Sequence, residues 1–476
     1  MKHLTNESRV ATLNEKITEL NAVSPTFCLA KWTQSTTTLY NGYTHSCHHP
    51  SAHKIKVEDI LKNPRGLHNT PIKIAARKDM LEGIQTKECD YCWNIENLGQ
   101  DHFSDRHYKS ANEGMGIWQQ FDNVIKSKLG ENIAPTYLEI AFENICNFKC
   151  SYCSPDVSSR WMEEIQEHGG YELPGGSTHH DLEWQKKIGK FPIHHKEQNP
   201  YIDAFWEWWP ELYKSLDTFR ITGGEPLLSD NTWKILDYVI ANPRKDFKLS
   251  INTNMGIPQK LVQKLCEKIN QLHGKIREIT IFTSAESTDE WAEYSRFGMN
   301  WQLFKKNIEF FLDNTPPSVR LQFMTTVNIL SVTSFDWFLL FIGELRKQYG
   351  CRRERNRIGF NVAYLRWPRH QSITLLDKIQ KRIFAKKMED ALAKLTIGGH
   401  EHFIHNLYIE EVDQIRRLID FMNSVEPDPE QLDAFVSFFD EYDKRRSTSL
   451  LATFPELTET YALGKKIQMK RFNADS

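Results

Sequence analysis

The sequence lacks an excess of either charge, because 60 Lys and Arg residues balance 62 Asp and Glu residues for a formal net charge of −2. Such a balance gives no whole-protein electric field that would attract nucleic acid or an anionic membrane. A basic segment interleaved with aromatic residues is also missing. Both absences disfavour nucleic acid as a partner.

Long apolar runs, internal repeats and low-complexity tracts are missing as well. No window approaches the ~20 apolar residues that span a bilayer, and the apolar stretches 337–345 and 435–442 have the length of core helices. The opening residues are polar and charged, unlike a secretory signal peptide. We therefore expect no membrane association and a cytoplasmic location.

What the sequence does contain is typical of a folded protein of two or three domains, with 476 residues, 40% of them apolar and 12% aromatic. Residues 1–110 are rich in turn residues and cysteine and predict a small, loop-rich, metal-stapled module. Residues 131–370 alternate short β-type segments with amphipathic helices, and residues 371–476 have helical patterns. The expected strands are 136–144, 217–224, 247–255, 277–286, 319–328 and 357–367.

Repeated strand–helix units indicate a parallel sheet. In segment 247–255, Ser250, Asn252 and Asn254 share one face, and mainly apolar residues share the other. A sheet covered on both sides should be apolar on both faces, whereas a polar face suits a barrel interior that holds a polar ligand. We therefore predict an α/β fold with a partial (β/α)6 TIM-type barrel, a small N-terminal cysteine-rich module and a C-terminal helical extension.

Seven of the nine cysteines form two groups, which in a reducing cytosol indicates metal binding or catalysis rather than disulfides. Cys266 and Cys351 stand apart, and we interpret them as ordinary core or surface thiols. Cys146, Cys150 and Cys153 directly follow the first expected strand. This spacing is too tight for a zinc knuckle, and three thiolates would leave one iron of a 4Fe–4S cluster open.

The CxxxCxxC triplet, with Tyr152 before its last cysteine, resembles the signature of the radical S-adenosylmethionine superfamily. The resemblance implies that the open iron binds S-adenosylmethionine. Reductive cleavage would then give methionine and a 5′-deoxyadenosyl radical that abstracts hydrogen from a substrate. It also implies an electron donor such as a flavodoxin or ferredoxin.

A GGEP segment at the end of the second expected strand resembles the family's GGE motif, which binds the amino group of the methionine moiety. Glycines allow close backbone approach and a carboxylate can accept from an ammonium, although an ordinary strand-to-helix turn has the same sequence. The residues implied are Gly223, Gly224, Glu225 and Pro226.

Polar residues at later strand ends resemble the family's contacts to the ribose and carboxylate of the cofactor. Asn252 and Asn254 match the ribose contacts, with turn-forming asparagine as the alternative. Ser284 and the downstream Arg296 are further candidates, although Arg296 also suits a solvated helix face. Asn328 is the last and weakest candidate.

The second cysteine group comprises Cys28, Cys47, Cys89 and Cys92, enough thiols to ligate one cluster fully. The CX13GX4C run, with Gly42 as its glycine, resembles the hairpin of Twitch and SPASM auxiliary-cluster modules. Those modules usually follow the barrel, whereas this one precedes it, and four cysteines fit the one-cluster Twitch type better. Structural zinc is the alternative, since CxxC pairs bind zinc and two histidines follow Cys47.

The substrate is not fixed by cofactor or fold. Enzymes with auxiliary clusters often modify peptides or proteins, so we predict hydrogen abstraction from a peptide or protein side chain, with a small metabolite as the close alternative. A zinc-bound scaffold without enzymatic activity is the non-catalytic alternative. We interpret the histidine pairs 48–49, 179–180 and 194–195 as solvated loop residues, and 165–205 as an insertion that can serve as a lid.

Overall fold

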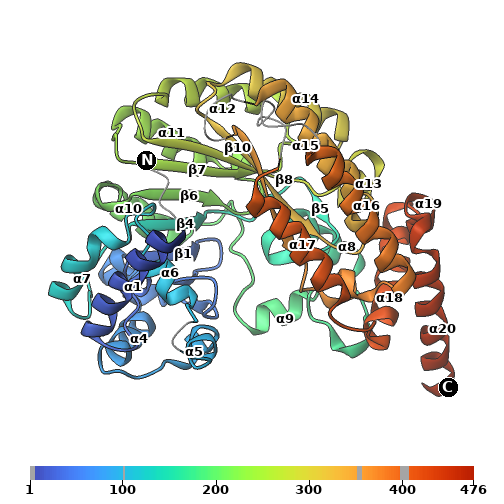
Figure 1. Cartoon of the computed structure of the whole chain (residues 1–476), viewed down its shortest axis with the longest axis horizontal. Coiled ribbons are helices and arrows are strands. Elements are labelled where there is room, and N and C mark those ends of the chain that lie inside the picture. The colour runs from blue at the N-terminus through green and yellow to red at the C-terminus, as the bar shows by residue number, and fades with distance from the viewer. Residues whose placement is uncertain (1–5, 100–101, 351–355, 397–406, 476) are drawn as a thin grey trace.

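The protein has a mixed α/β fold built around one large, mostly parallel sheet (Figure 1). The computed structural model describes residues 6–99, 102–350, 356–396 and 407–475. The large sheet has nine strands in the order β11-β10-β8-β7-β6-β4-β1-β2-β3, and β5 and β9 form a separate ribbon. Cys351 lies outside the described residues.

Six of these strands confirm the six strands expected from the sequence. They are β4 (Tyr137–Ala141), β6 (Thr218–Thr222), β7 (Lys248–Thr253), β8 (Glu278–Ser284), β10 (Arg320–Val327) and β11 (Ile358–Tyr364). All neighbouring pairs among them are parallel, and their order in the sheet follows their order in the chain.

Helices connect these strands, as parallel pairing requires. They are α8 (Ser159–His168), α9 (Leu182–Lys187), α10 (Pro200–Ser215), α11 (Asp230–Ala241), α12 (Gln259–Leu272), α13 (Asp289–Ser295), α14 (Trp301–Asn314) and α15 (Phe335–Tyr349). Figure 1 shows α11, α12 and α14 side by side along the sheet. Cys266 is buried in α12, which confirms it as a core thiol.

The two faces of the parallel strands differ in the way that the alternation predicts. One face is apolar and buried, as shown by Ile221, Ile251 and Phe323, each 0% exposed. On the other face Asn252 is half-buried and Asn361 is exposed. Polar side chains on this second face therefore remain accessible.

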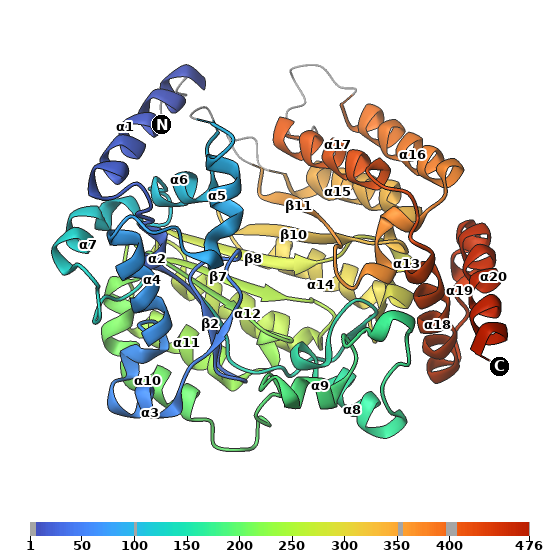
Figure 2. The same cartoon turned by 90° about the horizontal axis from the view of Figure 1, so that it is seen from below.

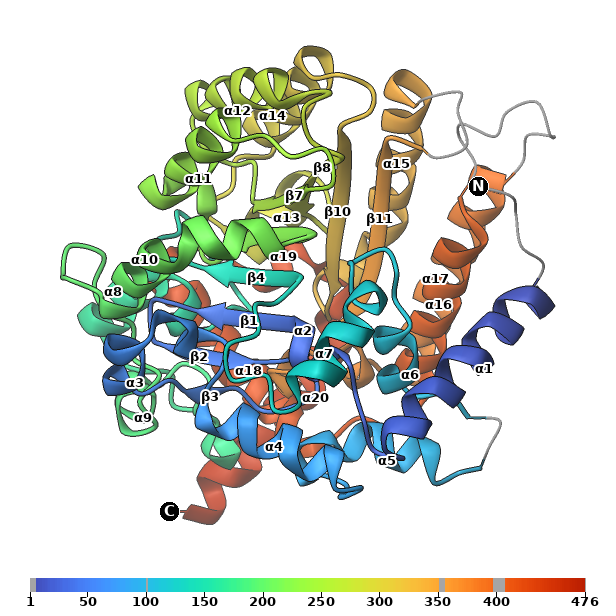
Figure 3. The same ribbon diagram turned by 90° about the vertical axis from the view of Figure 1, so that its left-hand side faces the viewer.

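The N-terminal module is joined to the same sheet (Figure 3). Strand β1 (Gln34–Thr38) pairs parallel with β4, and the antiparallel strands β2 (Tyr43–His45) and β3 (His53–Lys54) continue outward. The expectation of a loop-rich module is wrong, because the module is largely helical. Its helices are α1 (Asn6–Val23), α2 (Ala30–Thr33), α3 (Val57–Lys62), α4 (Pro71–Leu81), α5 (Asp90–Glu96) and α6 (Asp105–Ser110), and α7 (Phe121–Ser127) follows the module before β4.

The C-terminal residues are helical, as predicted, and lie across the molecule from the N-terminal module (Figures 1 and 2). The helices are α16 (Lys378–Thr396), α17 (Ile409–Asn423), α18 (Pro429–Arg446), α19 (Leu450–Thr453) and α20 (Thr458–Asp475).

Helix α17 protects the edge strand β11. Arg346 of α15 makes a buried two-pronged ion pair with Glu411 of α17, and the Val362 N–H of β11 donates to Gln414 at 2.7 Å. An otherwise unpaired strand edge is thereby covered. Within the described part of the chain, we find no helix with the length and apolar character needed to cross a membrane.

Candidate functional site

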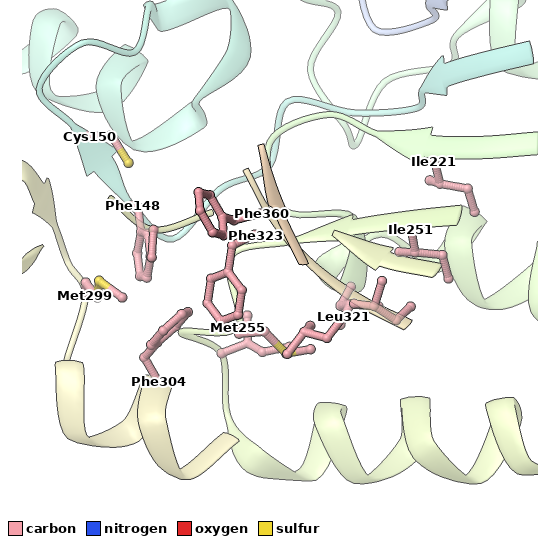
Figure 4. Close-up of a cluster of buried hydrophobic side chains, with 14 of the residues drawn as sticks. Phe148, Cys150, Ile221, Ile251, Met255, Met299, Phe304, Leu321, Phe323 and Phe360 are labelled. Carbon is pink, nitrogen blue, oxygen red and sulfur yellow. The ribbon is translucent and has the colours of Figure 1, made fainter. Parts of the chain in front are cut away.

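The cysteine triplet lies in the loop that follows β4, at the carboxyl end of the parallel strands. Cys150 belongs to β5 (Lys149–Cys150), which pairs with β9 (Arg296–Phe297). Figure 4 shows Phe148 and Cys150 beside the hydrophobic core around Phe323 and Phe360. The loop is thus anchored in the core on one side. The ends of parallel strands are where such folds concentrate their chemistry.

Side chains from distant segments hold four successive carbonyl oxygens of this loop. Trp161 Nε1 donates to Cys150 O at 2.9 Å, and Gln371 Nε2 donates to Ser151 O at 2.9 Å. The Nε2 atoms of His179 and His180 lie 3.1 Å from the carbonyl oxygens of Tyr152 and Cys153. Since a carbonyl can only accept, both histidines carry their proton on Nε2.

These contacts correct the interpretation of histidines 179–180 as solvated residues. His180 is 2% exposed, and burial lowers the pKa of both side chains, so both are neutral. The insertion that contains them braces the cysteine loop.

Glu164 of α8 ties the loop to the C-terminal helices. Its carboxylate accepts hydrogen bonds from Lys149 Nζ at 2.6 Å and from Arg446 Nη2 of α18 at 2.7 Å. It also accepts a hydrogen bond from the Tyr171 hydroxyl. Burial of a carboxylate is unfavourable unless it is paired, and here two cations pair with it. Helix α18 is therefore part of the support of the loop.

Burial raises the pKa of all three loop thiols, that of Cys146 to about 12. Cys150 is 7% exposed and accepts a hydrogen bond from Arg296. Buried free thiols are neutral at physiological pH, and deprotonation to metal-ligating thiolates would be driven by metal binding itself.

The GGEP turn touches the backbone that leads into the cysteine loop. A Cβ at Gly224 would lie 2.3 Å from Ile145 O, and one at Gly223, whose φ is +130°, would lie 2.7 Å from Glu143 O. The Glu225 N–H donates to Ile145 O at 2.6 Å. The close approach that the glycines permit is therefore to the protein's own main chain.

The Glu225 carboxylate is 1% exposed and accepts from the backbone N–H groups of Leu227 at 3.0 Å and Asn254 at 2.5 Å. Burial raises its pKa to about 7. Asn254 in turn donates from Nδ2 to Asn147 Oδ1 at 2.8 Å, within the cysteine loop. The second and third of the six expected strands are thereby tied to the loop, and Pro226 is buried at the start of the turn that follows Glu225.

The remaining predicted cofactor contacts, Asn252, Ser284 and Asn328, differ in how accessible their side chains are. Asn252 and Ser284 are half-buried on the accessible sheet face, and Asn252 Oδ1 accepts from Arg220 Nε at 3.0 Å. Asn328 is 0% exposed, and its amide caps its own turn by accepting from the N–H groups of residues 330 and 331. Its side chain is used within that turn, so we do not include Asn328 among the cofactor-binding residues.

Arg296 is not on a solvated helix face. It is 5% exposed, and its guanidinium is paired with Glu286, which is 0% exposed. Tyr152 also donates to Glu286, at 3.2 Å. This buried pair lies against Cys150.

The four other cysteines of the predicted sites line a single cavity in the N-terminal module. Cys28 precedes β1 and Cys47 follows β2, so the antiparallel β1–β2 pairing brings the two together. Gly42 makes the turn with a φ of +65°, and a Cβ there would lie 2.1 Å from the Tyr201 ring. Cys89 and Cys92 complete the lining from the start of α5.

Cationic side chains surround this cavity. Lys31, Arg106 and Lys109 line it together with the thiols, and the first two are 3% exposed. Burial raises the pKa of all four thiols, whereas the charges of Lys31 and Arg106 lower the pKa of Cys28. Fixed positive charge suits a negatively charged thiolate-bound metal group.

The histidines beside Cys47 form a separate hydrogen-bonded cluster at the edge of the cavity. His49 Nε2 lies 2.7 Å from Asp105 Oδ2, and its ring stacks on Tyr91. Lys109 Nζ lies 2.8 Å from His48 Nδ1 and 3.2 Å from Asp105. The Lys109 ammonium already contacts two of these three groups, His48 and Asp105, which makes the cluster a poor site for a second cation.

The distances between the sulfur atoms indicate whether a cysteine group is arranged as the ligands of a single metal ion. Among the residues the structure describes, only His48, His49 and Asp105 form a trio whose ligand atoms all lie within 4.8 Å of one another. Tetrahedral zinc with bonds of about 2.3 Å requires sulfur atoms about 3.8 Å apart. No three thiols in either group lie within 4.8 Å of one another, so neither group has the compact arrangement of a single-ion zinc site.

The two cysteine groups flank opposite ends of the β1–β4 strand pair. Cys28 lies before β1, and the triplet follows β4, which runs parallel to β1. Five residues of β1 span about 17 Å of extended chain. A shared ligand for both groups is excluded by this separation.

Sequence reasoning missed three contributors to the triplet's surroundings: His180, Glu286 and Gln371. Each lies more than twenty-five residues from the cysteines in sequence, and no local pattern links them to the triplet. No protein-family model matches the chain, and a search of curated proteins finds no match either.

Proposed function

We propose that the chain is a radical S-adenosylmethionine enzyme. The observation that carries the proposal is the loop after β4, where three cysteines in a CxxxCxxC run lie at the carboxyl end of a parallel sheet and are not gathered within 4.8 Å as ligands of one ion are. When bound, a 4Fe–4S cluster supplies the electron that cleaves S-adenosylmethionine to methionine and a 5′-deoxyadenosyl radical. Cys146, Cys150 and Cys153 would hold it.

The arrangement of the sheet supports a partial barrel of six strand–helix units as the scaffold. Its strands follow chain order, whereas a doubly wound sheet reverses direction at a switch point. The polar face carrying Asn252 and Asn361 suits a barrel interior. We propose that this face is the interior and that the substrate lies along it.

The protein's own groups would bind and orient the cofactor. We assign the turn of Gly223, Gly224 and Glu225 to the methionine moiety, because this turn borders the cysteine loop directly. The Glu225 carboxylate positions the turn by accepting from two backbone N–H groups. Asn252 and Ser284, half-buried on the polar face, are assigned to the ribose; Asn254 acts indirectly by holding Asn147.

For the N-terminal module we propose an auxiliary iron–sulfur cluster of the Twitch type. Four thiols in one cavity, the hairpin with Gly42 at its turn and the cationic lining support a closed, four-thiolate site. We favour a cluster over structural zinc because no three of these four thiols lie within 4.8 Å of one another.

We propose hydrogen abstraction from a peptide or protein side chain as the reaction. A cavity on the polar face is lined by Ser250, Thr280, Gln322 and Asn361, together with the charged Lys248, Glu278 and Arg320. It lies toward the amino ends of the strands, so a substrate bound there would have to extend along the polar face to the cysteine loop at their carboxyl ends. Amide and hydroxyl groups along such a groove can pair with a peptide backbone. A small polar metabolite is the second candidate that this lining accepts.

The test is anaerobic purification followed by iron, sulfide and zinc determination and by assay of reductive S-adenosylmethionine cleavage. We expect about eight irons per chain, as two 4Fe–4S clusters contain, and production of 5′-deoxyadenosine. A content of about four irons and one zinc per chain would instead assign structural zinc to the N-terminal module. An iron-loaded, reduced protein that yields no 5′-deoxyadenosine would exclude the proposed activity, and a colourless zinc protein would leave the scaffold alternative.

A further inference from the structure

Arg296 is fixed opposite Cys150 by backbone pairing. Strands β5 and β9 form an antiparallel ribbon in which Cys150 and Arg296 are direct partners. The Ser151 N–H donates to Ser295 O at 2.8 Å and extends the pairing by one residue. The guanidinium therefore has little freedom to leave the thiol.

The guanidinium divides its donors between a thiol and a carboxylate. Its Nη1 donates to Cys150 Sγ at 3.7 Å. Its Nε and Nη2 donate to the two oxygens of Glu286, at 3.1 and 2.5 Å. Tyr152 donates to the same carboxylate, so Glu286 is satisfied within the network.

We propose that Arg296 and Glu286 are a positioning pair that sets the reduction potential of the metal centre at the triplet by controlling the charge on the Cys150 sulfur. The proposal rests on the proposed function, since it requires a cluster bound by these thiols. It differs from the expectation that Arg296 holds the cofactor carboxylate. The edge of the guanidinium best suited to a carboxylate is already occupied by Glu286.

Removing Arg296 and removing the charge of Glu286 should change the reduction potential in opposite directions. A hydrogen bond and a positive charge at a cluster thiolate stabilise the more negative, reduced state, and so raise the potential. Removing Arg296 should therefore lower the potential. Removing the negative charge of Glu286 leaves the positive charge uncompensated and should raise it.

The experiment is a potentiometric titration of the full-length, anaerobically reconstituted protein, followed by electron paramagnetic resonance. The signal of the triplet cluster is identified by its change on addition of S-adenosylmethionine. For R296M we expect about a tenfold change in the one-electron reduction equilibrium, a shift of 59 mV to lower potential. For E286Q we expect a shift to higher potential, and for R296K, which keeps the charge, a smaller shift than for R296M.

Arg346→Met is the matched control. Arg346 also forms a buried two-pronged ion pair, with Glu411, but between α15 and α17 rather than at the cysteine loop. Its loss should destabilise the fold without moving the potential. A purely structural role of Arg296 would give the same pattern as this control.

Three results would overturn the inference. The first is an unchanged potential in iron-loaded R296M, and the second is a shift of R296M and E286Q in the same direction. The third is weaker S-adenosylmethionine binding by R296M, measured by calorimetry, at an unchanged potential, which would make Arg296 a cofactor ligand. Absence of iron from the parent protein would instead overturn the proposed function and this inference together, so the two failures are distinguishable.

Discussion

The two cysteine groups of this protein are held in place in different ways. The triplet lies in a loop whose carbonyl groups are held from outside by side chains of α8, the insertion and residue 371. The four-cysteine cavity is formed by a hairpin and the start of α5 within one module, and its lining includes Lys31, Arg106 and Lys109.

The two cysteine groups differ in the number of thiols that they offer to a metal group. If each group binds a 4Fe–4S cluster as proposed, the three thiols would leave a coordination position for an exchangeable ligand, as open catalytic metal sites do. The four thiols of the cavity would leave none, which is typical of a structural or electron-transfer site.

Replacing Cys146, Cys150 and Cys153 together by Ala should have the largest effect. We expect iron to fall by about half, to about four per chain, and 5′-deoxyadenosine production to fall below detection, since the exchangeable site is lost. Iron analysis and chromatography of the reaction products measure both quantities. Cys266→Ala, in the buried face of α12, is the control and should change neither. Retained cleavage in the triple variant would assign the chemistry to the other cysteine group.

Replacing Cys89 and Cys92 by Ala should also halve the iron content but leave cleavage of S-adenosylmethionine within about threefold of the parent. The reason is that the cavity and the triplet lie at opposite ends of the β1–β4 pair. Substrate turnover and thermal stability are expected to fall, because the module loses the group that joins its segments. Loss of one zinc with unchanged iron would contradict the auxiliary-cluster assignment.

The parallel sheet could be predicted from the sequence because its information is local. Segments such as 247–255 alternate apolar and polar residues, and the structure has a strand at each expected position. The N-terminal module, predicted as residues 1–110, was misjudged because its helices lack a strong apolar period. In addition, the pairing of β1 with β4 joins residues about a hundred positions apart. Nothing in the pattern of residues 34–38 indicates that partner.

The cysteines of the candidate site were also recognisable from the sequence, since their spacing is a local property. The supports were not, because His180, Glu286 and Gln371 acquire their roles only through folding. The GGEP segment shows an intermediate case. Its glycines indicate a close approach, but only the structure identifies the partner as the backbone of residues 143–145.

Gly42→Ala tests the hairpin that brings Cys28 and Cys47 together. We expect a loss of roughly 3 kcal/mol in the free energy of unfolding, from a positive φ and from contact with the Tyr201 ring. Iron in the four-cysteine cavity should fall, whereas that of the triplet should not. Gly274→Ala is the matched control, because its φ is +71° with no atom within 4 Å of the added Cβ, and should cost only about 1 kcal/mol. Equal losses in the two variants, measured by urea denaturation, would contradict the proposed contact.

Glu225→Gln tests the support of the triplet through pH. Burial raises the pKa of Glu225 from 4.5 to about 7, so its carboxyl group favours the folded state most below pH 4.5 and loses that contribution as pH rises through 7. Gln does not ionise. The stability of the variant relative to the parent should therefore improve by up to about 3 kcal/mol between pH 4.5 and 7.5, added to a pH-independent cost of losing one acceptor for the Leu227 and Asn254 N–H groups. Urea denaturation midpoints of the metal-free parent and variant across this pH range measure the difference. If the stabilities of the two proteins change with pH in parallel, the carboxyl group is solvated rather than buried between the second and third parallel strands.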